Sequence, residues 1–303
     1  MPSKNEKIGS AVRIVALCSV WSVGTLHAAD PTGSGSEPAI VYSEQSLPTH
    51  TIYRPEKLRD DRYPVVLWGN GSCVNSNFGY REFLAEVASH GFIVVAIGPY
   101  RDSPAPRQPR PADPAEWPPF ETHHSQLLDG LAWLEAENGR EGSPFRGRVA
   151  LDKVAVMGHS CGGLQAVKAS VDPRITTVVV LNSGMFPDGD QYMIRHELER
   201  SIFDEMHAPI AYFIGGESDI AYENAELDWA VLQTLEIAAI NANMDVGHGG
   251  TYGMSNGGPF ARGPLAWLEW QLRGSVEASR MFVGEDCGFC TDSEWTLRRH
   301  FPE

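Results

Sequence analysis

The sequence predicts an α/β fold, with a mostly parallel central sheet flanked by helices on both faces. Three observations lead to this expectation. Short, continuously apolar runs recur along the chain, as is typical of strands buried on both faces. Segments with helical periodicity separate these runs, so strands and helices alternate. The length of 303 residues, 42% of them hydrophobic, suits one globular domain of this kind.

The expected strands are apolar runs bounded by turn residues. The clearest are PVVLWG at residues 64–69 and FIVVAIG at residues 92–98, in which no charged side chain interrupts the run. In chain order, strands are expected at residues 39–43, 50–53, 64–69, 92–98, 154–158, 176–182, 210–215 and 237–243.

The expected helices lie between these strands. A helical segment at 80–90 ends at Gly91, the segment at 124–138 is amphipathic, and further helices are expected after residue 163 and near 259–273. Residues 102–120 are crowded with proline and are expected to form a surface loop or flap. Two arrangements fit this order, a doubly wound nucleotide-binding fold and an α/β-hydrolase fold, and the loops must distinguish them.

The loop at residues 158–163 reads GHSCGG and lies directly between an expected strand and an expected helix. A nucleophilic serine on a sharp strand-to-helix turn needs small residues two positions before and two after it, because a side chain there would obstruct the turn. Neither phosphate-loop pattern, G-x-G-x-x-G or G-x-x-x-x-G-K-[ST], is present in this loop. The loop therefore predicts the α/β-hydrolase fold, with Ser160 as nucleophile.

In this fold the catalytic acid and base follow the serine, the acid first. Asp219 follows the expected strand at 210–215 and is the predicted acid, with Glu217 as its competitor. His248 lies in a glycine-flanked loop and is the predicted base. The alternative base, His300, is three residues from the C-terminus, where chains are often poorly ordered.

Two backbone N–H groups are expected to stabilise the oxyanion that forms during acyl transfer. One belongs to Cys161, the residue after the nucleophile, and the other to Ser72 or, alternatively, Gly71 in the loop after the third strand. Met185 and Phe186 follow the strand at 176–182 and are expected to contact the substrate; the alternative is ordinary loop packing.

Composition excludes several classes of partner. The chain carries 24 basic and 39 acidic residues, a net charge of −15, which disfavours nucleic acids and anionic membrane surfaces. No H-E-x-x-H motif is present and the single C-x-x-C has no second ligand pair, so neither a metal nor another cofactor is expected. We expect a monomer without stable membrane insertion.

The N-terminus has the pattern of an export signal. Basic residues precede an apolar core at 14–26, and Ala28 and Ala29 offer small residues for cleavage. We therefore expect a signal peptide at residues 1–29, a single domain at 30–303, and a secreted or periplasmic location; the alternative is a buried N-terminal helix.

An exported chain meets an oxidising environment, in which cysteines form disulfides. Ser72 precedes Cys73, and Cys161 is itself a proposed oxyanion donor, so the two cysteines are expected to be neighbours in space. We predict a Cys73–Cys161 disulfide beside the oxyanion hole and a Cys287–Cys290 disulfide near the C-terminus. The alternatives are a free Cys161 with a buried Cys73, and a thiol–disulfide redox site at Cys287 and Cys290.

Several segments together resemble the bacterial cutinase-like and dienelactone-hydrolase-like α/β-hydrolases, which include poly(ethylene terephthalate) hydrolases. The resemblance covers about residues 60–275 and rests on PVVLWGNGS, LAEVASHGFIVVAIG, RGRVALDKVAVMGHSCGG, GGESDIA and VGHGG. It implies cofactor-free hydrolysis of carboxylic esters, with Ser160, Asp219 and His248 as the triad. Ser72 and Gly184 stand where the polyester hydrolases place cleft aromatics, and the tail DCGFCTDSEW is longer than the family pattern.

These observations predict an exported serine esterase that forms an acyl-enzyme on Ser160. Without those two aromatics, small or short-chain soluble esters are expected to be better substrates than a polymer. A polyester or cutin hydrolase is the alternative within the same class. The alternative from another class is a binding protein that keeps the fold without turnover.

Overall fold

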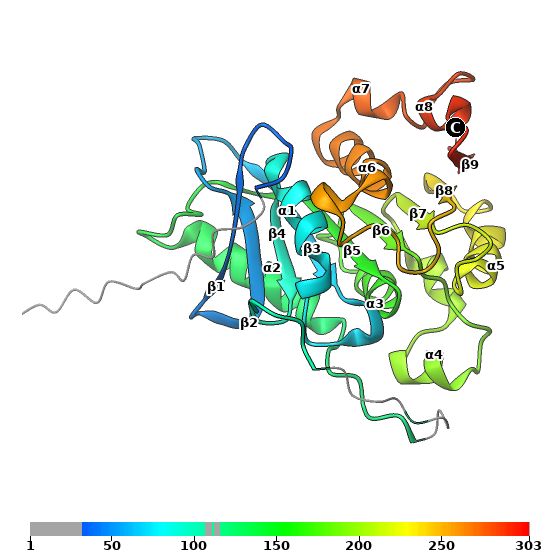
Figure 1. Ribbon diagram of the computed structural model, residues 1–303, viewed down its shortest axis with the longest axis horizontal. Helices are drawn as coiled ribbons and strands as arrows, with labels where there is room; N and C mark the ends of the chain where they lie inside the picture. Colours follow the sequence, from blue (N-terminus) through cyan, green and yellow to red (C-terminus); the bar gives the residue numbers. More distant parts are fainter. Residues whose placement is uncertain (1–31, 107–110, 112–115, 303) are drawn as a thin grey trace, which may run out of the picture.

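The computed structural model describes residues 32–106, 111 and 116–302, in which nine strands form one sheet (Figure 1). The strand order is β1-β2-β4-β3-β5-β6-β7-β8-β9. All pairs between β4 and β8 are parallel, whereas β1–β2, β2–β4 and β8–β9 are antiparallel. The strands are β1 (Ala39–Glu44), β2 (Leu47–Pro55), β3 (Tyr63–Gly69), β4 (Ile93–Ile97), β5 (Val149–His159), β6 (Thr177–Leu181), β7 (Ile210–Ile214), β8 (Ala239–Met244) and β9 (Trp295–His300).

Helices cover both faces of this sheet. The α-helices are α1 (Arg81–Ser89), α2 (Ser125–Gly139), α3 (Cys161–Ala169), α4 (Gln191–His196), α5 (Tyr222–Leu232), α6 (Arg262–Arg273), α7 (Val276–Ser279) and α8 (Gly288–Thr291). Short 3-10 helices are η1 (Gly71–Cys73), η2 (Phe78–Tyr80), η4 (Arg200–Glu205), η5 (Ser255–Gly257) and η6 (Pro259–Ala261).

Alternating strand residues supply the two cores. Val65 and Leu67 of β3 belong to the buried cluster that includes α2, α3 and α5, whereas Val66 and Trp68 belong to the cluster that includes α1 and α6. Since successive side chains point to opposite faces of a sheet, a fully apolar strand is what a two-sided core requires. The predicted α/β-hydrolase fold, with a mostly parallel sheet flanked by helices, is confirmed.

The strand order creates a crevice beside β3. The chain passes from β3 to β4 on one side and then to β5 on the other, so the loops after β3 and β5 leave the sheet in different directions. Ligands of open α/β sheets bind at such a switch point, outside the carboxyl ends of the strands. The loops that carry Ser72 and Ser160 follow these two strands.

The C-terminal region departs from expectation, because Trp295–His300 forms the ordered edge strand β9, paired with β8. The His300 ring lies 2.7 Å (Nε2) from the Leu235 carbonyl oxygen, away from the crevice, so its position rather than disorder removes it from the site. Across the described ranges, no helix combines the length and the apolar character needed to cross a bilayer. The expected export signal at residues 1–29 lies outside the described residues.

Candidate active site

Ser160 occupies the turn between β5 and α3 with a positive φ of 53° and a ψ of −120°. A backbone with positive φ is strained for a residue other than glycine, and such strain is typical of functional sites. Two bonds hold the turn: the Ser160 N–H donates to the Leu181 carbonyl at 2.9 Å, and the Ser183 hydroxyl donates to the Ser160 carbonyl at 2.7 Å. A Cβ on Gly158 or Gly162 would collide with neighbouring backbone, which explains both glycines.

The structure brings Ser160, His248 and Asp219 into one hydrogen-bonded chain. His248 Nε2 lies 3.0 Å from Ser160 Oγ, and His248 Nδ1 lies 2.7 Å from Asp219 Oδ1. The Asp219 side chain is fully buried, whereas the His248 ring is 26% exposed. The competing acid, Glu217, is exposed on the surface of the same loop. This arrangement can transfer a proton from the serine hydroxyl to the imidazole.

Four hydrogen bonds keep Asp219 ionised. Burial alone would raise the pKa of its carboxyl, but bonds to His248, the Ala221 N–H, the Asn182 amide and the Gly215 N–H outweigh burial and lower the pKa to about 2. The Asn182 and Gly215 donors lie 2.7 Å and 3.0 Å from Asp219 Oδ2. An aspartate that stays charged can stabilise a positive charge on the neighbouring His248 ring.

Sequence reasoning missed Asn182, whose side chain forms hydrogen bonds with both Asp219 and the buried Tyr252. Its amide oxygen accepts a bond from the Tyr252 hydroxyl, and its amide nitrogen also donates to the Gly247 carbonyl at 3.1 Å. Asn182 thus fixes both Asp219 and the loop that carries His248. The sequence signal that could have identified it is its position directly after the buried strand β6, where site residues of parallel sheets gather.

His159 links the loop that carries His248 to the loop at Gly71–Cys73, which holds the predicted donor Ser72. Its Nε2 lies 2.8 Å from the His248 carbonyl, which can only accept, so Nε2 must carry the proton. Nδ1 therefore accepts from the Tyr80 hydroxyl at 2.9 Å, and the Tyr80 oxygen accepts the Gly71 N–H at 3.0 Å. Burial lowers the pKa of His159 to about 4, so the imidazole is neutral at pH 7.

This buried histidine makes stability depend on pH. Its pKa is depressed from 6.5 to about 4, so below about pH 6.5 the unfolded chain binds a proton that the folded chain does not. We expect the free energy of unfolding to fall as the pH is lowered from 6.5 to 4, and His159→Gln to reduce this slope. Denaturant titrations at pH 7, 5.5 and 4 measure it, with the exposed His207→Gln as control. An unchanged slope in His159→Gln would contradict the assignment.

The loop at Gly71–Cys73 favours Ser72 over its alternative, Gly71, as the second predicted oxyanion donor. The Gly71 N–H is engaged by Tyr80, and the two bonds of η1 use the N–H groups of Cys73 and Val74. Ser72 has a φ of 54° and is exposed, and it lines the same pocket as Ser160 and Cys161. The Cys161 N–H opens α3, where helical N–H groups have no acceptor within the helix. Ser72 and Cys161 both line the pocket beside Ser160, in loops joined by a disulfide, and they stay the two predicted oxyanion donors.

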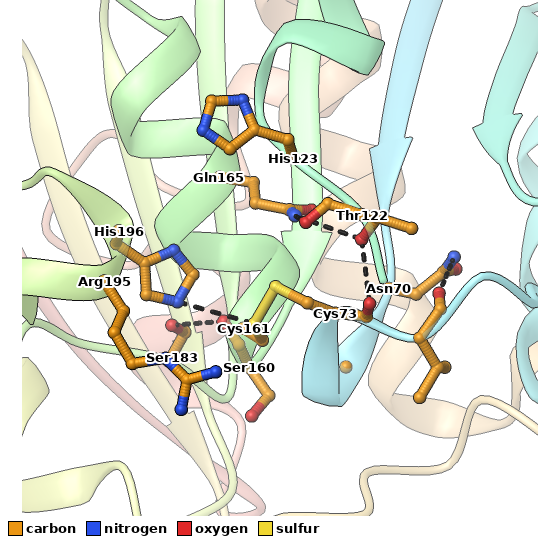
Figure 2. Close-up of a disulfide and its surroundings, with 12 residues drawn as sticks. Asn70, Cys73, Thr122, His123, Ser160, Cys161, Gln165, Ser183, Arg195 and His196 are labelled. Carbon is orange, nitrogen blue, oxygen red and sulfur yellow. Dashed lines mark hydrogen bonds between the residues drawn. A yellow bond between two sulfur atoms is a disulfide. The ribbon is translucent and has the colours of Figure 1, made fainter. Parts of the chain in front are cut away.

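Both predicted disulfides are present in the structure. The Cys73–Cys161 disulfide joins the two loops of the expected oxyanion hole, with 5.3 Å between the two Cα atoms (Figure 2). The Thr122 hydroxyl donates to the Cys73 carbonyl at 3.0 Å, and His196 Nε2 lies 3.5 Å from Cys161 Sγ. Among the described residues, Cys73, Cys161 and His196 form the one cluster of His, Cys, Asp or Glu side chains with metal-ligand spacing. Because both sulfurs are used in the disulfide, the group is not a metal site in this form.

Removing the disulfide at the crevice is expected to affect both folding and rate. Cys73 and Cys161 are 88 positions apart, so Cys73→Ala with Cys161→Ala should lower the free energy of unfolding by roughly 4–5 kcal/mol. The turnover number should fall about 10-fold or more, because the two N–H donors are no longer fixed. The matched control, Cys287→Ala with Cys290→Ala, opens a loop of separation 3 and should cost only about 2 kcal/mol. Equal losses of stability in the two double variants, or full activity without the Cys73–Cys161 disulfide, would contradict this role of the disulfide.

An open pocket of about 740 Å³ lies over Ser160 and His248. Phe186 lines it and is 37% exposed, and its contact with substrate stays a prediction. Met185 does not: its side chain is fully buried in the core below the pocket, which corrects that expectation. Sequence reasoning missed two aromatic rings of the wall, Trp117 from the proline-rich segment and Tyr192 of α4. The residues 107–110 and 112–115 of that segment lie outside the described part.

No family model matches this chain. A search among curated proteins finds "Chlorophyllase type 0" of Chenopodium album, 35% identical over 104 residues. The similar region is 34% of this chain and 27% of the chlorophyllase, so it spans about a quarter of that protein. The likeness is local and agrees with the α/β architecture described above.

Proposed function

We propose that this protein is a carboxylic-ester hydrolase that works through an acyl-enzyme on Ser160. The observation that carries the proposal is the hydrogen-bonded chain from Ser160 through His248 to the buried Asp219, which opens into a pocket. The local similarity to a chlorophyllase, a carboxylic-ester hydrolase, supports the same class of reaction.

In the first half-reaction, Ser160 Oγ attacks the ester carbonyl carbon while His248 Nε2 takes the hydroxyl proton. The carbonyl oxygen becomes an oxyanion, which the N–H groups of Ser72 and Cys161 bind. The tetrahedral intermediate collapses when the bond to the alcohol oxygen breaks, and His248 gives its proton to that oxygen. The alcohol leaves and the acyl group stays on Ser160.

In the second half-reaction, water replaces the alcohol. His248 takes a proton from the water as it attacks the acyl carbon, and the oxyanion forms again in the same place. Collapse of this intermediate returns the proton to Ser160 Oγ and releases the carboxylic acid. Asp219 keeps its charge throughout and orients the imidazole.

Small or short-chain soluble esters are the proposed substrates. Polyesters are the second candidate, because the pocket is open and aromatic rings at Trp117, Phe186 and Tyr192 line it. Export to an oxidising compartment belongs to the same proposal, and the disulfides Cys73–Cys161 and Cys287–Cys290 support it.

A panel of 4-nitrophenyl esters from acetyl to long-chain, together with a polyester film, tests the proposal. We expect the largest kcat/KM with the shorter soluble esters. Faster release of product from the film would favour the polyester candidate. Hydrolysis of no ester at all would contradict the proposed function.

A further inference from the structure

The pocket contains one arginine, Arg195 of α4, which is the sole lysine or arginine among its described lining residues. Its side chain is half-buried. Figure 2 shows the guanidinium directed toward the Ser160 side chain and away from the neighbouring His196 ring. A positive charge therefore faces the space in which a substrate of Ser160 would lie.

Neutral contacts hold this guanidinium in place. Its Nη2 donates to the Pro118 carbonyl, and Cζ lies 4.6 Å from the centre of the Phe120 ring. Neither partner carries a negative charge that would neutralise the arginine. Since a guanidinium offers five N–H donors in a planar fork, the bond to Pro118 leaves donors for a second, planar partner such as a carboxylate.

No carboxylate of the described residues forms an ion pair with Arg195 within 4.0 Å, although acidic side chains outnumber basic ones, 39 to 24. Arg200, in contrast, does form an ion pair: its Nε lies 3.1 Å from Asp228 Oδ1. The acidic residue of the pocket wall, Asp190, accepts the Tyr192 N–H at 2.7 Å and caps the start of α4, whereas Arg195 lies near the end of that helix.

The surroundings of Arg195 are apolar and aromatic. The Tyr192 ring lies 6.2 Å from the Trp117 ring and 5.3 Å from the Phe186 ring, measured between ring centres, and all three residues line the pocket. A charge in such surroundings is less screened than one in open water. The wall thus combines a hydrocarbon surface with one fixed cation.

We propose that the pocket selects esters that carry a carboxylate in addition to the ester group, with Arg195 binding that carboxylate. Trp117, Phe186 and Tyr192 would contact the hydrocarbon part between the two groups. This inference rests on the proposed function, because the ester is the one cleaved at Ser160. Arg195 is here a specificity residue that touches substrate and takes no part in proton transfer.

Two matched pairs of esters test the assignment and identify the side of the ester that carries the charge. On the acyl side, mono-4-nitrophenyl adipate is compared with 4-nitrophenyl hexanoate. On the alcohol side, 3-(4-acetoxyphenyl)propanoate is compared with 4-propylphenyl acetate. We expect Arg195→Gln to lower the ratio of kcat/KM for the charged ester to that for the neutral ester by about 10-fold in one pair. Arg195→Lys should restore part of the ratio, and the exposed Arg280→Gln should leave it unchanged. An unchanged ratio in both pairs would overturn the assignment.

Equilibrium binding separates this inference from the proposed function. Calorimetry compares 3-phenylpropanoate with its neutral amide, 3-phenylpropanamide, on the wild-type protein and on Arg195→Gln. The acid should bind more tightly to the wild type, and the substitution should weaken the acid about 10-fold and the amide much less. Arg195-dependent binding without hydrolysis of any ester would support the carboxylate site and contradict the proposed function. Ester hydrolysis together with equal binding of the acid and the amide would support the proposed function and contradict the carboxylate site.

Discussion

Ser160→Ala is expected to lower ester turnover by roughly 10⁴–10⁶-fold, because the residues of a catalytic triad act as a unit and the proposed acyl-enzyme forms on Ser160. The loss should appear in kcat, with KM little changed, since the removed oxygen serves the chemical step. Among the described residues the hydroxyl bonds to His248 alone, so the variant should fold and melt like the wild type. Steady-state kinetics and thermal melting measure both parts.

The control for this variant is Ser201→Ala, which removes an exposed hydroxyl in η4. It should keep full activity. More than about a tenth of wild-type turnover in Ser160→Ala would contradict the acyl-enzyme mechanism, because residual catalysis without the nucleophile is far smaller.

Asp219→Asn is expected to lower kcat by roughly 10³–10⁴-fold, because an asparagine cannot stabilise the imidazolium and favours the wrong tautomer of His248. The substitution should also remove a dependence of stability on pH. The pKa of Asp219 is depressed from 3.8 to about 2, so its ionised form contributes stability above about pH 4 that is lost as the pH falls toward 2.

The matched control is Glu217→Gln, which neutralises the competing carboxylate two positions earlier. Glu217 is exposed, and its substitution should change kcat by less than about 2-fold. If Glu217→Gln were the more damaging of the two, Glu217 rather than Asp219 would be the acid and the buried hydrogen bonds of Asp219 would be structural.

Much of the fold could be predicted because strands buried on both faces appear in the sequence as continuous apolar runs. The runs at 64–69 and 92–98 have no polar face, and the structure places both inside the sheet, as β3 and β4, with strands on either side. The edge strand β9 could not be predicted in this way. Its sequence, WTLRRH, is charged, as suits an edge strand, and it is ordered by contacts that depend on folding: its pairing with β8, the buried Trp295 ring and the ion pair between Arg298 and Glu226.

The site could be predicted where chain order constrains it. The order serine, acid, histidine narrows the choice to a few residues, and those chosen meet in space. Partners that depend on folding could not be found: His159, Tyr80 and Asn182 act through contacts between loops distant in sequence. The prediction that Met185 contacts the substrate was wrong, because adjacent residues after a strand can point in opposite directions. The Met185 side chain is buried in the core, whereas Phe186 lines the pocket.

Covalent labelling tests the central claim most directly. A fluorophosphonate forms a stable adduct with an activated serine, so we would incubate the intact protein with it and locate the added mass by peptide mapping. The account predicts stoichiometric modification of Ser160 and loss of ester hydrolysis in proportion to labelling. Ser160→Ala should form no adduct, and His248→Ala should be labelled much more slowly than the wild type. An unlabelled Ser160 in a folded protein, or an adduct on Ser72 or Ser183 instead, would contradict it.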